Sequence, residues 1–337
     1  MHTGFMNLRK GISGLVIVLL LTGNINAQDT AHKHLFRIYE DNDFLDITGN
    51  GTDNSYTNGT RLDYFYSKKK KSRFIDHLLP RAGDSSTNVF GWSITQLMVT
   101  PNDISTTHYQ PDDYPYAGAL FLTHSLYSYN AVKKYSFQTE LVAGIRGPAS
   151  FAKETQIFIH RLINYQRPMG WSNQLTTYPL LNLNFTAEKQ LLGIGNFMEV
   201  IGGAQLNAGT FLDAAGFYPL IRIGKMSPYF NGFFDQYGSS YKNGKKIKTQ
   251  FYFVAKPEEV FVLHNALLHG ERMNEDTGEP GDKATGRRIR HRLTNIQFGA
   301  VLVHGNFSIS YLQTHSTEYN KGLYHHNWGN FSLYYQW

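Results

Sequence analysis

Apolar and polar residues alternate along much of the chain, most clearly in residues 135–143, 305–311 and 328–337. A period of two indicates β-strands, because successive side chains of a strand point to opposite faces. Alternation over about ten residues is typical of transmembrane strands, although a soluble β-sandwich would show it too. At the C-terminus, Phe331, Leu333, Tyr335 and Trp337 share one predicted face, opposite Asn330, Ser332, Tyr334 and Gln336.

Thirteen segments fit the strand pattern: 34–42, 56–66, 88–98, 118–130, 134–146, 177–188, 196–208, 211–224, 247–257, 259–269, 289–303, 305–315 and 326–337. A closed single-chain barrel with both ends in the periplasm needs an even number of strands. Either one segment is therefore not a separate strand, or residues 228–237 supply a fourteenth. The short connections 130–133 and 304–306 predict periplasmic turns, whereas 270–288 and 316–325 predict longer external loops.

One segment departs from this pattern and predicts a helix. Between Ser150 and Tyr165 the period changes to about 3.6. Pro148 precedes the segment, Ser150 has the side chain of an N-cap, and Glu154 suits the first turn. The predicted apolar stripe contains Phe151, Phe158 and Leu162, and the opposite stripe contains Lys153, Gln156 and His160.

The N-terminus has the pattern of a secretory signal peptide. Arg9 and Lys10 precede the apolar run 14–21, and Ala27 is a small residue before Gln28. The run is too short for a membrane-spanning helix, which needs roughly 20 residues. We therefore expect a cleaved signal peptide at 1–27, one barrel domain at 28–337, and localisation in the bacterial outer membrane.

Composition agrees with a barrel whose lumen is polar. Aromatic residues reach 15% while all hydrophobic residues reach only 41%, as expected when only alternate residues face lipid and aromatic girdles mark both interfaces. The net charge is +6, and removal of Arg9 and Lys10 with the signal leaves +4, which suits an anionic lipid surface. The compartment and the absence of a nucleic-acid motif argue against nucleic acid as a partner. The absence of cysteine excludes disulfides.

Two groups of residues are candidates for chemistry. Residues 40–44 and 53–59 are rich in oxygen-bearing side chains that a hard cation such as Ca²⁺ would bind, although a polar hairpin tip would have the same composition. Gln156 and His160 lie four residues apart on one helical face, and a histidine in such a place can act as a general base. The chain has 14 histidines, and a lone histidine is more often a loop or interface residue than a catalytic one. Gly-x-Ser-x-Gly and HExxH motifs are absent.

Several blocks together resemble the lipid A 3-O-deacylase family. They occur in the family's order and read EDNDF at 40–44, TDNSYTNG at 52–59, TPNDI at 100–104, DDYPYAG at 112–118, GIRGPASFAKETQIFIHRL at 144–162 and GWSNQL at 170–175. The resemblance implies an all-β fold: a transmembrane antiparallel barrel of 12 strands with a short helix in an external loop. It also implies an active site with bound Ca²⁺ between the barrel wall and that helix.

The resemblance assigns roles to individual positions. It implies that His160 is the base, that Gln156 is its partner on the helix, and that Thr57 belongs to the site. Asn42 and Asp43 match the pair at the metal. Two positions depart from the family pattern, since residues 102–107 contain no lysine and Tyr114 replaces a frequent arginine. Lys153 or Arg146 would then have to contact the substrate phosphates.

These observations predict a Ca²⁺-dependent esterase that removes an ester-linked acyl chain from the 3-position of lipid A by means of water activated by His160. We expect a monomer whose partners are lipopolysaccharide and the outer membrane. Two alternatives remain open from the sequence. One is an outer-membrane phospholipase with a Ser-His site, and the other is a non-enzymatic pore or structural barrel.

Overall fold

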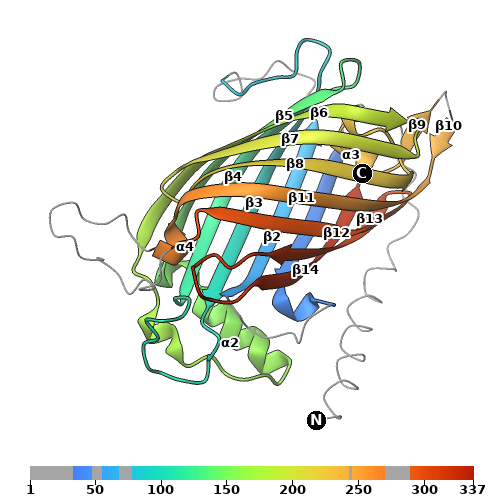
Figure 1. Ribbon diagram of the computed structural model, residues 1–337. Helices are drawn as coiled ribbons and strands as arrows, with labels where there is room; N and C mark the ends of the chain where they lie inside the picture. The colour runs from blue at the N-terminus through green and yellow to red at the C-terminus, as the bar shows by residue number, and fades with distance from the viewer. Residues whose placement is uncertain (1–32, 48–54, 68–77, 243–244, 270–288) are drawn as a thin grey trace.

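The chain forms a closed antiparallel barrel of twelve strands (Figure 1). The computed structural model describes residues 33–47, 55–67, 78–242, 245–269 and 289–337. The predicted signal peptide, the external loop at 270–288 and the oxygen-rich residues 48–54 lie outside these residues. The barrel strands are β1 (His34–Asn42), β2 (Ser55–Ser67), β3 (Thr87–Thr100), β4 (Ala117–Asn130), β5 (Tyr135–Arg146), β6 (Tyr178–Ile194), β7 (Met198–Gly209), β8 (Leu212–Lys225), β11 (Thr249–Asn265), β12 (Arg292–His304), β13 (Phe307–Ser316) and β14 (His326–Gln336).

The strand count settles at twelve because two predicted strands are one. Residues 247–257 and 259–269 were predicted separately, but β11 runs through both and pairs continuously with β12. Pro257 interrupts the sequence pattern without ending the strand, since it faces Ile296 of β12 and, on the β8 side, the position of Pro219. The alternative of a fourteenth strand at 228–237 is wrong, because those residues form two short helices.

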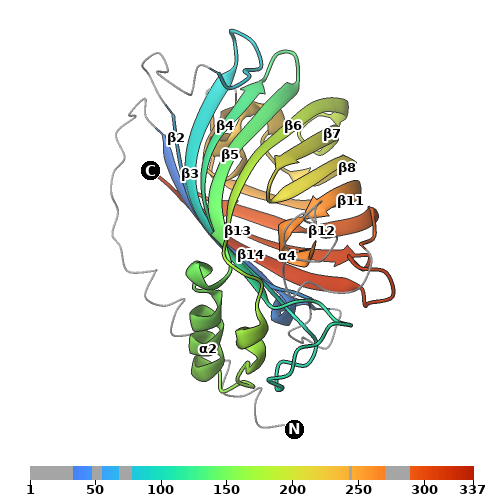
Figure 2. The same cartoon turned by 90° about the vertical axis from the view of Figure 1, so that its left-hand side faces the viewer.

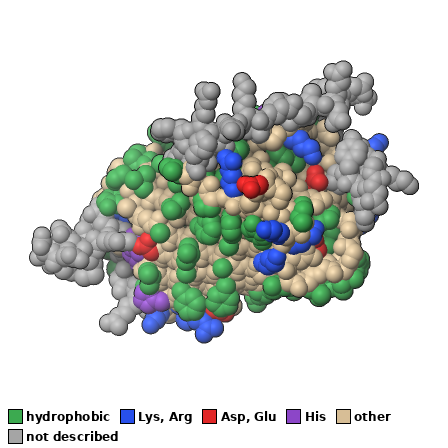
Figure 3. All heavy atoms as spheres, turned by 90° about the horizontal axis from the view of Figure 1, so that it is seen from above, with side chains coloured by type: hydrophobic (Ala, Val, Ile, Leu, Met, Phe, Trp, Pro, Cys, Tyr) green, Lys and Arg blue, Asp and Glu red, His purple; other side chains and the backbone are tan. Residues whose placement is uncertain are grey.

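The strands alternate as predicted, with apolar side chains outside and polar side chains inside. In β1, Phe36 and Ile38 are exposed on the outer face, whereas Leu35 is completely buried. The lumen next to β1 holds a charged network, in which Asp63 binds Arg37 at 2.7 Å and Arg61 at 2.6 Å. Figure 3 shows hydrophobic side chains spread over one side of the wall. Such a distribution fits a barrel whose outer surface contacts lipid.

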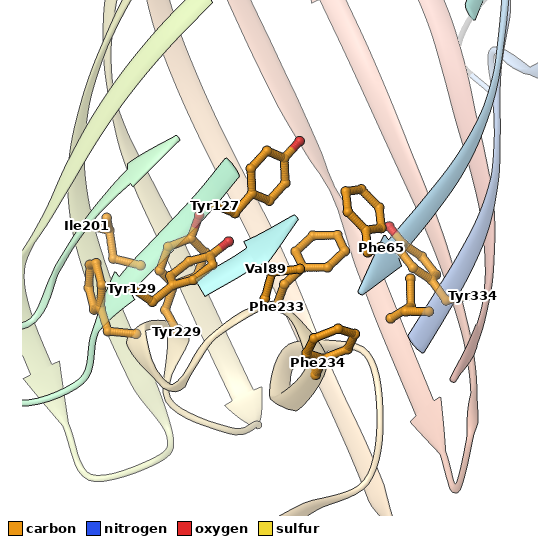
Figure 4. Packing of buried hydrophobic residues seen from close by; sticks show 11 residues of the cluster. Phe65, Val89, Tyr127, Tyr129, Ile201, Tyr229, Phe233, Phe234 and Tyr334 are labelled. Carbon is orange, nitrogen blue, oxygen red and sulfur yellow. The ribbon is translucent and has the colours of Figure 1, made fainter. Parts of the chain in front are cut away.

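A short segment between β8 and β11 fills the lumen at one end. It contains η5 (Tyr229–Asn231) and α3 (Phe233–Gln236), followed by the small sheet of β9 (Ser240–Lys242) and β10 (Lys245–Ile247). Phe233 packs on Phe65 of the wall with ring centroids 4.6 Å apart. Figure 4 shows this aromatic cluster inside the barrel. The segment therefore acts as a plug, which we name the lumenal plug (residues 229–236).

The two ends of the barrel differ in their connections. The predicted tight turns are present at 131–134 and 305–306, at the end that carries the C-terminus. The opposite end carries η1 (Asp43–Leu45), η3 (Pro148–Ser150), α2 (Ala152–Leu162), η4 (Gly170–Asn173), α4 (Ala266–His269) and the loop 317–325. Each helix among the described residues is too short or too polar to cross a membrane.

Candidate active site

Helix α2 begins with a turn that the sequence did not reveal. The prediction placed the helix at 150–165 with Ser150 as N-cap, but α2 covers Ala152–Leu162 and its N-cap is Phe151, in the left-handed conformation with φ 58°. Pro148 to Ser150 forms a 3-10 turn, and the Ser150 hydroxyl donates to the Gly147 carbonyl at 2.7 Å. The turn directs the chain out of β5 and back along the barrel wall.

Helix α2 buries polar side chains and exposes large apolar ones, the reverse of an amphipathic helix in a water-soluble protein. Ala152, Gln156 and His160 form its buried stripe, whereas Phe158 and Leu162 are 59% and 65% exposed. Figure 2 shows α2 beside the outside of the wall rather than inside the barrel. Of the predicted polar stripe, Gln156 and His160 therefore face protein, whereas Lys153 is exposed, and the apolar residues Phe158 and Leu162 face the surroundings. Exposed apolar side chains beside exposed charged ones suit a helix at the level where lipid meets water.

Close contacts hold the start of α2 on the outer face of β3 and β4. A Cβ added at Gly118 would lie only 2.3 Å from the Cβ of Ala152 and 2.5 Å from the hydroxyl of Ser150. Gln96 of β3 donates from Nε2 to the carbonyl of Ser150 at 2.7 Å. Met98, Ile104, Tyr116, Ala152 and Trp171 form a buried apolar cluster under the helix. Only glycine at 118 permits the helix to approach the wall this closely.

Hydrogen bonds fix Gln156 and His160, the two candidate catalytic residues of α2. Gln156 accepts from the indole of Trp171 at 2.7 Å through Oε1, while its buried Nε2 has no hydrogen-bond partner among the residues that the structure describes. The Nδ1 atom of His160 lies 2.5 Å from the carbonyl of Gln166. A carbonyl only accepts, so Nδ1 carries the hydrogen, and in the neutral ring the lone pair belongs to Nε2. Tyr165 packs edge-on against the same ring.

Asn42 and Asp43 lie at the end of β1, where η1 begins. Asn42 caps η1 by accepting from the backbone N–H of Phe44 at 2.8 Å, and Asp43 is buried. The turn folds outward over β14, because the carbonyl of Leu45 occupies the place that a Cβ on Gly329 would take. Burial, followed by the charge of Asp113, raises the pKa of Tyr324, and the charge of Asp43 adds to it. Asp43 is therefore near the loop that contains Tyr324.

Thr57 occupies an irregular position in β2. The register of β2 against β3 shifts between Tyr56 and Asn58, so Thr57 is the extra residue of a β-bulge. Its hydroxyl lies 2.7 Å from that of Thr100, and both residues are buried. A bulge bends its strand and redirects side chains, which is why bulges occur next to functional sites.

The strand register brings the two halves of the site onto one outer surface. Asn42 pairs with Asn58, Asn58 with Met98, and Met98 with Gly118, which lies under α2. Neighbouring strands are about 4.8 Å apart, so this row spans roughly 14 Å. Figures 1 and 2 both show η1 and α2 at the same end of the barrel. Polar outward-facing residues lie along and beside this row, and we name them the outer-wall strip (residues 40, 42, 58, 60 and 96).

The donor atoms near Asn42 and Asp43 suit a hard cation better than a transition metal. They are carboxylate, amide and hydroxyl oxygens, which Ca²⁺ prefers. Among the described residues, no group of three or more His, Cys, Asp or Glu side chains is arranged to hold a metal. The Asp43 carboxylate and the Asn42 amide oxygen are donors of the kind that Ca²⁺ accepts.

The residues considered for phosphate contacts have different environments. Arg146 is fully buried and donates to the carbonyls of Thr176 and Ala266, so its geometry does not support that role. Tyr114 is also fully buried, and its hydroxyl bonds to the loop that includes Tyr319. Lys153 is exposed and lines a cavity of about 480 Å³ beside Glu154 and Trp171. Of the three, only Lys153 is placed where it can reach a ligand.

Sequence reasoning missed two residues that build the site. Trp171 holds Gln156, and Gln96 joins the wall to α2. Trp171 lies in GWSNQL, one of the blocks on which the family resemblance rests, but the resemblance assigned no role to this residue. Gln96 interrupts the apolar face of a lipid-facing strand, and this polar exception was the signal that would have identified it.

The fold and this surface define a class of protein, a twelve-stranded membrane β-barrel with a polar site on its outer wall under a helix of an external loop. The family model described as "Outer membrane protein LpxR" matches residues 15–337, so the chain belongs to the LpxR family of outer-membrane β-barrels.

A solved structure agrees on the fold. LpxR from Salmonella typhimurium superposes with a TM-score of 0.69 at 15% identity, over 89% of this chain and 99% of that chain. The β domain of the Bordetella autotransporter Brka superposes with a TM-score of only 0.43 at 8% identity, over 91% of this chain and 99% of that chain. A search of curated proteins gives no match. The predicted fold and family are thereby confirmed.

Proposed function

We propose that this protein is an outer-membrane esterase that hydrolyses an ester-linked acyl chain at the 3-position of lipid A, with Ca²⁺ and a water activated by His160. The observation that carries the proposal is the buried polar stripe of α2, which holds Gln156 and His160 against the outer wall of the barrel. A site on the lipid side lets the acyl chains of the substrate stay in the bilayer. Extracting them would cost about 0.8 kcal/mol per methylene.

His160 is suited to the role of general base. Its Nδ1–H is fixed by the carbonyl of Gln166, which orients the ring and leaves Nε2 as the basic atom. Nε2 removes a proton from water as the water oxygen attacks the ester carbonyl, and it gives that proton to the sugar oxygen as the ester C–O bond breaks, so that the products are a fatty acid and a sugar hydroxyl. A positioned base of this kind contributes roughly 10²–10⁴ in rate.

Gln156 supplies a hydrogen-bond donor that has no partner within the described part of the chain. A buried amide N–H with no acceptor costs about 1–3 kcal/mol, and Gln156 Nε2 is such a group. A carbonyl or hydroxyl oxygen of the substrate would satisfy it. Trp171 fixes the other end of the amide, so the donor is already oriented before the substrate binds.

A hard cation at Asp43 would be held by the carboxylate together with the oxygens of Asn42 and neighbouring groups. When bound, Ca²⁺ polarises the ester carbonyl and stabilises negative charge that develops on its oxygen. The role of Asp43 is to place that charge at the end of β1, on the same surface that α2 covers. Thr57, in the bulge of the adjacent strand, keeps that end of β2 in position through Thr100.

Neither alternative gains support from a specific observation. A Ser-His pair that uses His160 is disfavoured, since α2 contains no serine and the hydroxyl of Ser150, which precedes the helix, donates to the carbonyl of Gly147. A pore is disfavoured because the lumenal plug packs on Phe65 and Tyr127 inside the wall.

Mass spectrometry of lipid A tests the proposal. Cells that express the protein should contain lipid A that lacks one ester-linked acyl chain, and cells that express the His160→Ala variant should not. Purified protein should release the same fatty acid from lipid A in detergent micelles. Unchanged lipid A in the presence of abundant, folded protein in the outer membrane would refute the proposal.

A further inference from the structure

Three lysines gather at the barrel end that carries the C-terminus. Lys133 and Lys134 belong to the tight turn between β4 and β5, and Lys189 of β6 pairs with Tyr135, the first residue of β5. Lys133 and Lys189 are exposed, and Lys134 is half-buried. The Lys189 ammonium donates to the carbonyl of Lys133 and lies 5.8 Å from the ring centre of Tyr135. We name this cluster the lysine corner (residues 133, 134 and 189).

The charge of the lysine corner is not balanced by a carboxylate. Within the described ranges, none of its lysines forms an ion pair with Asp or Glu. The adjacent carboxylate of Glu188 faces the lumen instead, where the hydroxyls of Tyr218 and Tyr229 donate to it at 2.9 and 2.8 Å. Cations that are held together repel one another, and an anion bound beside them would offset that repulsion.

An aromatic surface continues from the lysine corner along the outside of the wall. Ser136 of β5 donates to Glu188 inside the lumen at 2.9 Å, so the alternate residues Tyr135 and Phe137 face outward. Phe137 packs on Phe185 of β6 with ring centres 5.6 Å apart. Aromatic side chains of barrels mark the level where the membrane meets water. Lysines just beyond such rings extend their ammonium groups among the lipid headgroups.

We propose that the lysine corner is a headgroup site for an anionic phospholipid of the phosphatidylglycerol type. The phosphodiester contacts the ammonium groups of Lys133 and Lys189, and an acyl chain runs over Phe137 and Phe185 toward the middle of the membrane. A headgroup that carries its own ammonium group binds less well, because that group offsets the charge of the phosphate.

The position of the lysine corner favours a phospholipid over lipid A as the occupant. The corner lies at the end of the barrel opposite to α2, and the predicted orientation places this end in the periplasm. The leaflet of an outer membrane that faces the periplasm consists of phospholipids. The site is therefore separate from the surface under α2, and the inference does not depend on the proposed function.

Native mass spectrometry of the mature protein in detergent micelles tests the inference. Phosphatidylglycerol and phosphatidylcholine with the same acyl chains are compared by the Kd of the first bound lipid. We expect wild-type protein to prefer phosphatidylglycerol. Lys133→Gln/Lys189→Gln should bind this lipid about 30-fold more weakly, since each cation near an anionic lipid surface contributes about fivefold. The matched control Lys225→Gln/Lys248→Gln removes the same charge at the end of β8 and just before β11, and it should leave both Kd values unchanged.

Several outcomes would overturn the inference. Equal affinity of wild-type protein for both lipids would do so, and equal losses in the two double variants would indicate a general effect of basic residues at this end. Displacement of phosphatidylglycerol by inorganic phosphate at the same concentration would show that the corner binds a free anion and not a lipid. Lys133→Arg/Lys189→Arg should keep the wild-type preference, and its loss there would contradict a role for charge. Should the glutamine variant not assemble, a wild-type preference that is unchanged between about 0.05 and 0.5 M NaCl would still refute the proposal.

Discussion

The contact between Gly118 and α2 allows a sharp test of how the site is assembled. Gly118 lies on the outer face of β4, and a Cβ there would be 2.3 Å from the Cβ of Ala152. Unbonded carbon atoms normally lie about 3.5–4.0 Å apart, so Gly118→Ala should force the start of the helix away from the wall by more than about 1 Å. A misplacement of about 1 Å can reduce a rate roughly 100-fold.

We therefore expect Gly118→Ala to lower kcat/KM for fatty-acid release from lipid A by about 100-fold while the barrel still folds, because the added methyl group meets only the external loop. The barrel is assayed by its migration in unboiled SDS gels. The emission of Trp171, measured against a Trp171→Phe variant, should shift to the red as the buried indole is exposed. A matched control is Gly202→Ala on β7, where the new Cβ would lie 3.1 Å from the flexible end of Leu191.

Wild-type kcat/KM in Gly118→Ala, together with unchanged Trp171 emission, would show that the position of α2 does not depend on this contact. A loss of activity accompanied by loss of the folded barrel would also contradict the reasoning, since it would make Gly118 a residue of the barrel rather than of the site. Equal losses in Gly118→Ala and Gly202→Ala would point to a general sensitivity of the wall to substitution.

Four further results are expected. His160→Ala should lower kcat by roughly 10²–10⁴ with the barrel intact, and wild-type turnover in purified protein would remove it as the base. Asp43→Ala should abolish the response of activity to added Ca²⁺, and full activity of wild-type protein in excess chelator would contradict a role for the ion. Burial, then the charges of two nearby histidines, lowers the pKa of His269 to about 4. This pKa lies below that of an unfolded histidine, so the contribution of neutral His269 to the stability of α4 is complete above about pH 6.5 and is lost toward pH 4. Amide exchange in α4 should therefore accelerate at pH 5 relative to pH 7. Unchanged exchange would refute this role of His269. N-terminal sequencing of the mature protein should find a start near Gln28, whereas an intact Met1 would exclude cleavage.

The barrel could be predicted from the sequence because its governing rule is local. Alternation in the last strand placed Asn330 and Ser332 inside and Trp337 outside, and both placements hold. The rule failed at Pro257, because β11 continues through the proline, paired with β12 on both sides of it. It also failed at 228–237, where aromatic side chains fill the lumen rather than form wall.

The site was less accessible to sequence reasoning, because its contacts are non-local. The polar stripe of α2 was visible in the sequence, but its burial follows from Gly118, which comes more than thirty residues earlier. The roles of Trp171 and Gln96 depend on which strands are neighbours. Glu40 appeared in the sequence as one member of an acidic cluster, and only the register of β1 shows that it faces outward.

The row from Asn42 to Gly118 has a consequence for the life of the protein before it reaches its membrane. The row exists only when four consecutive strands are in register, and α2 packs on two of them, β3 and β4. A chain in transit through the periplasm contains all of these residues but no assembled surface. If the protein is the hydrolase proposed above, it would be latent during export, and completion of the barrel would be the step that activates it in the membrane whose lipids it attacks.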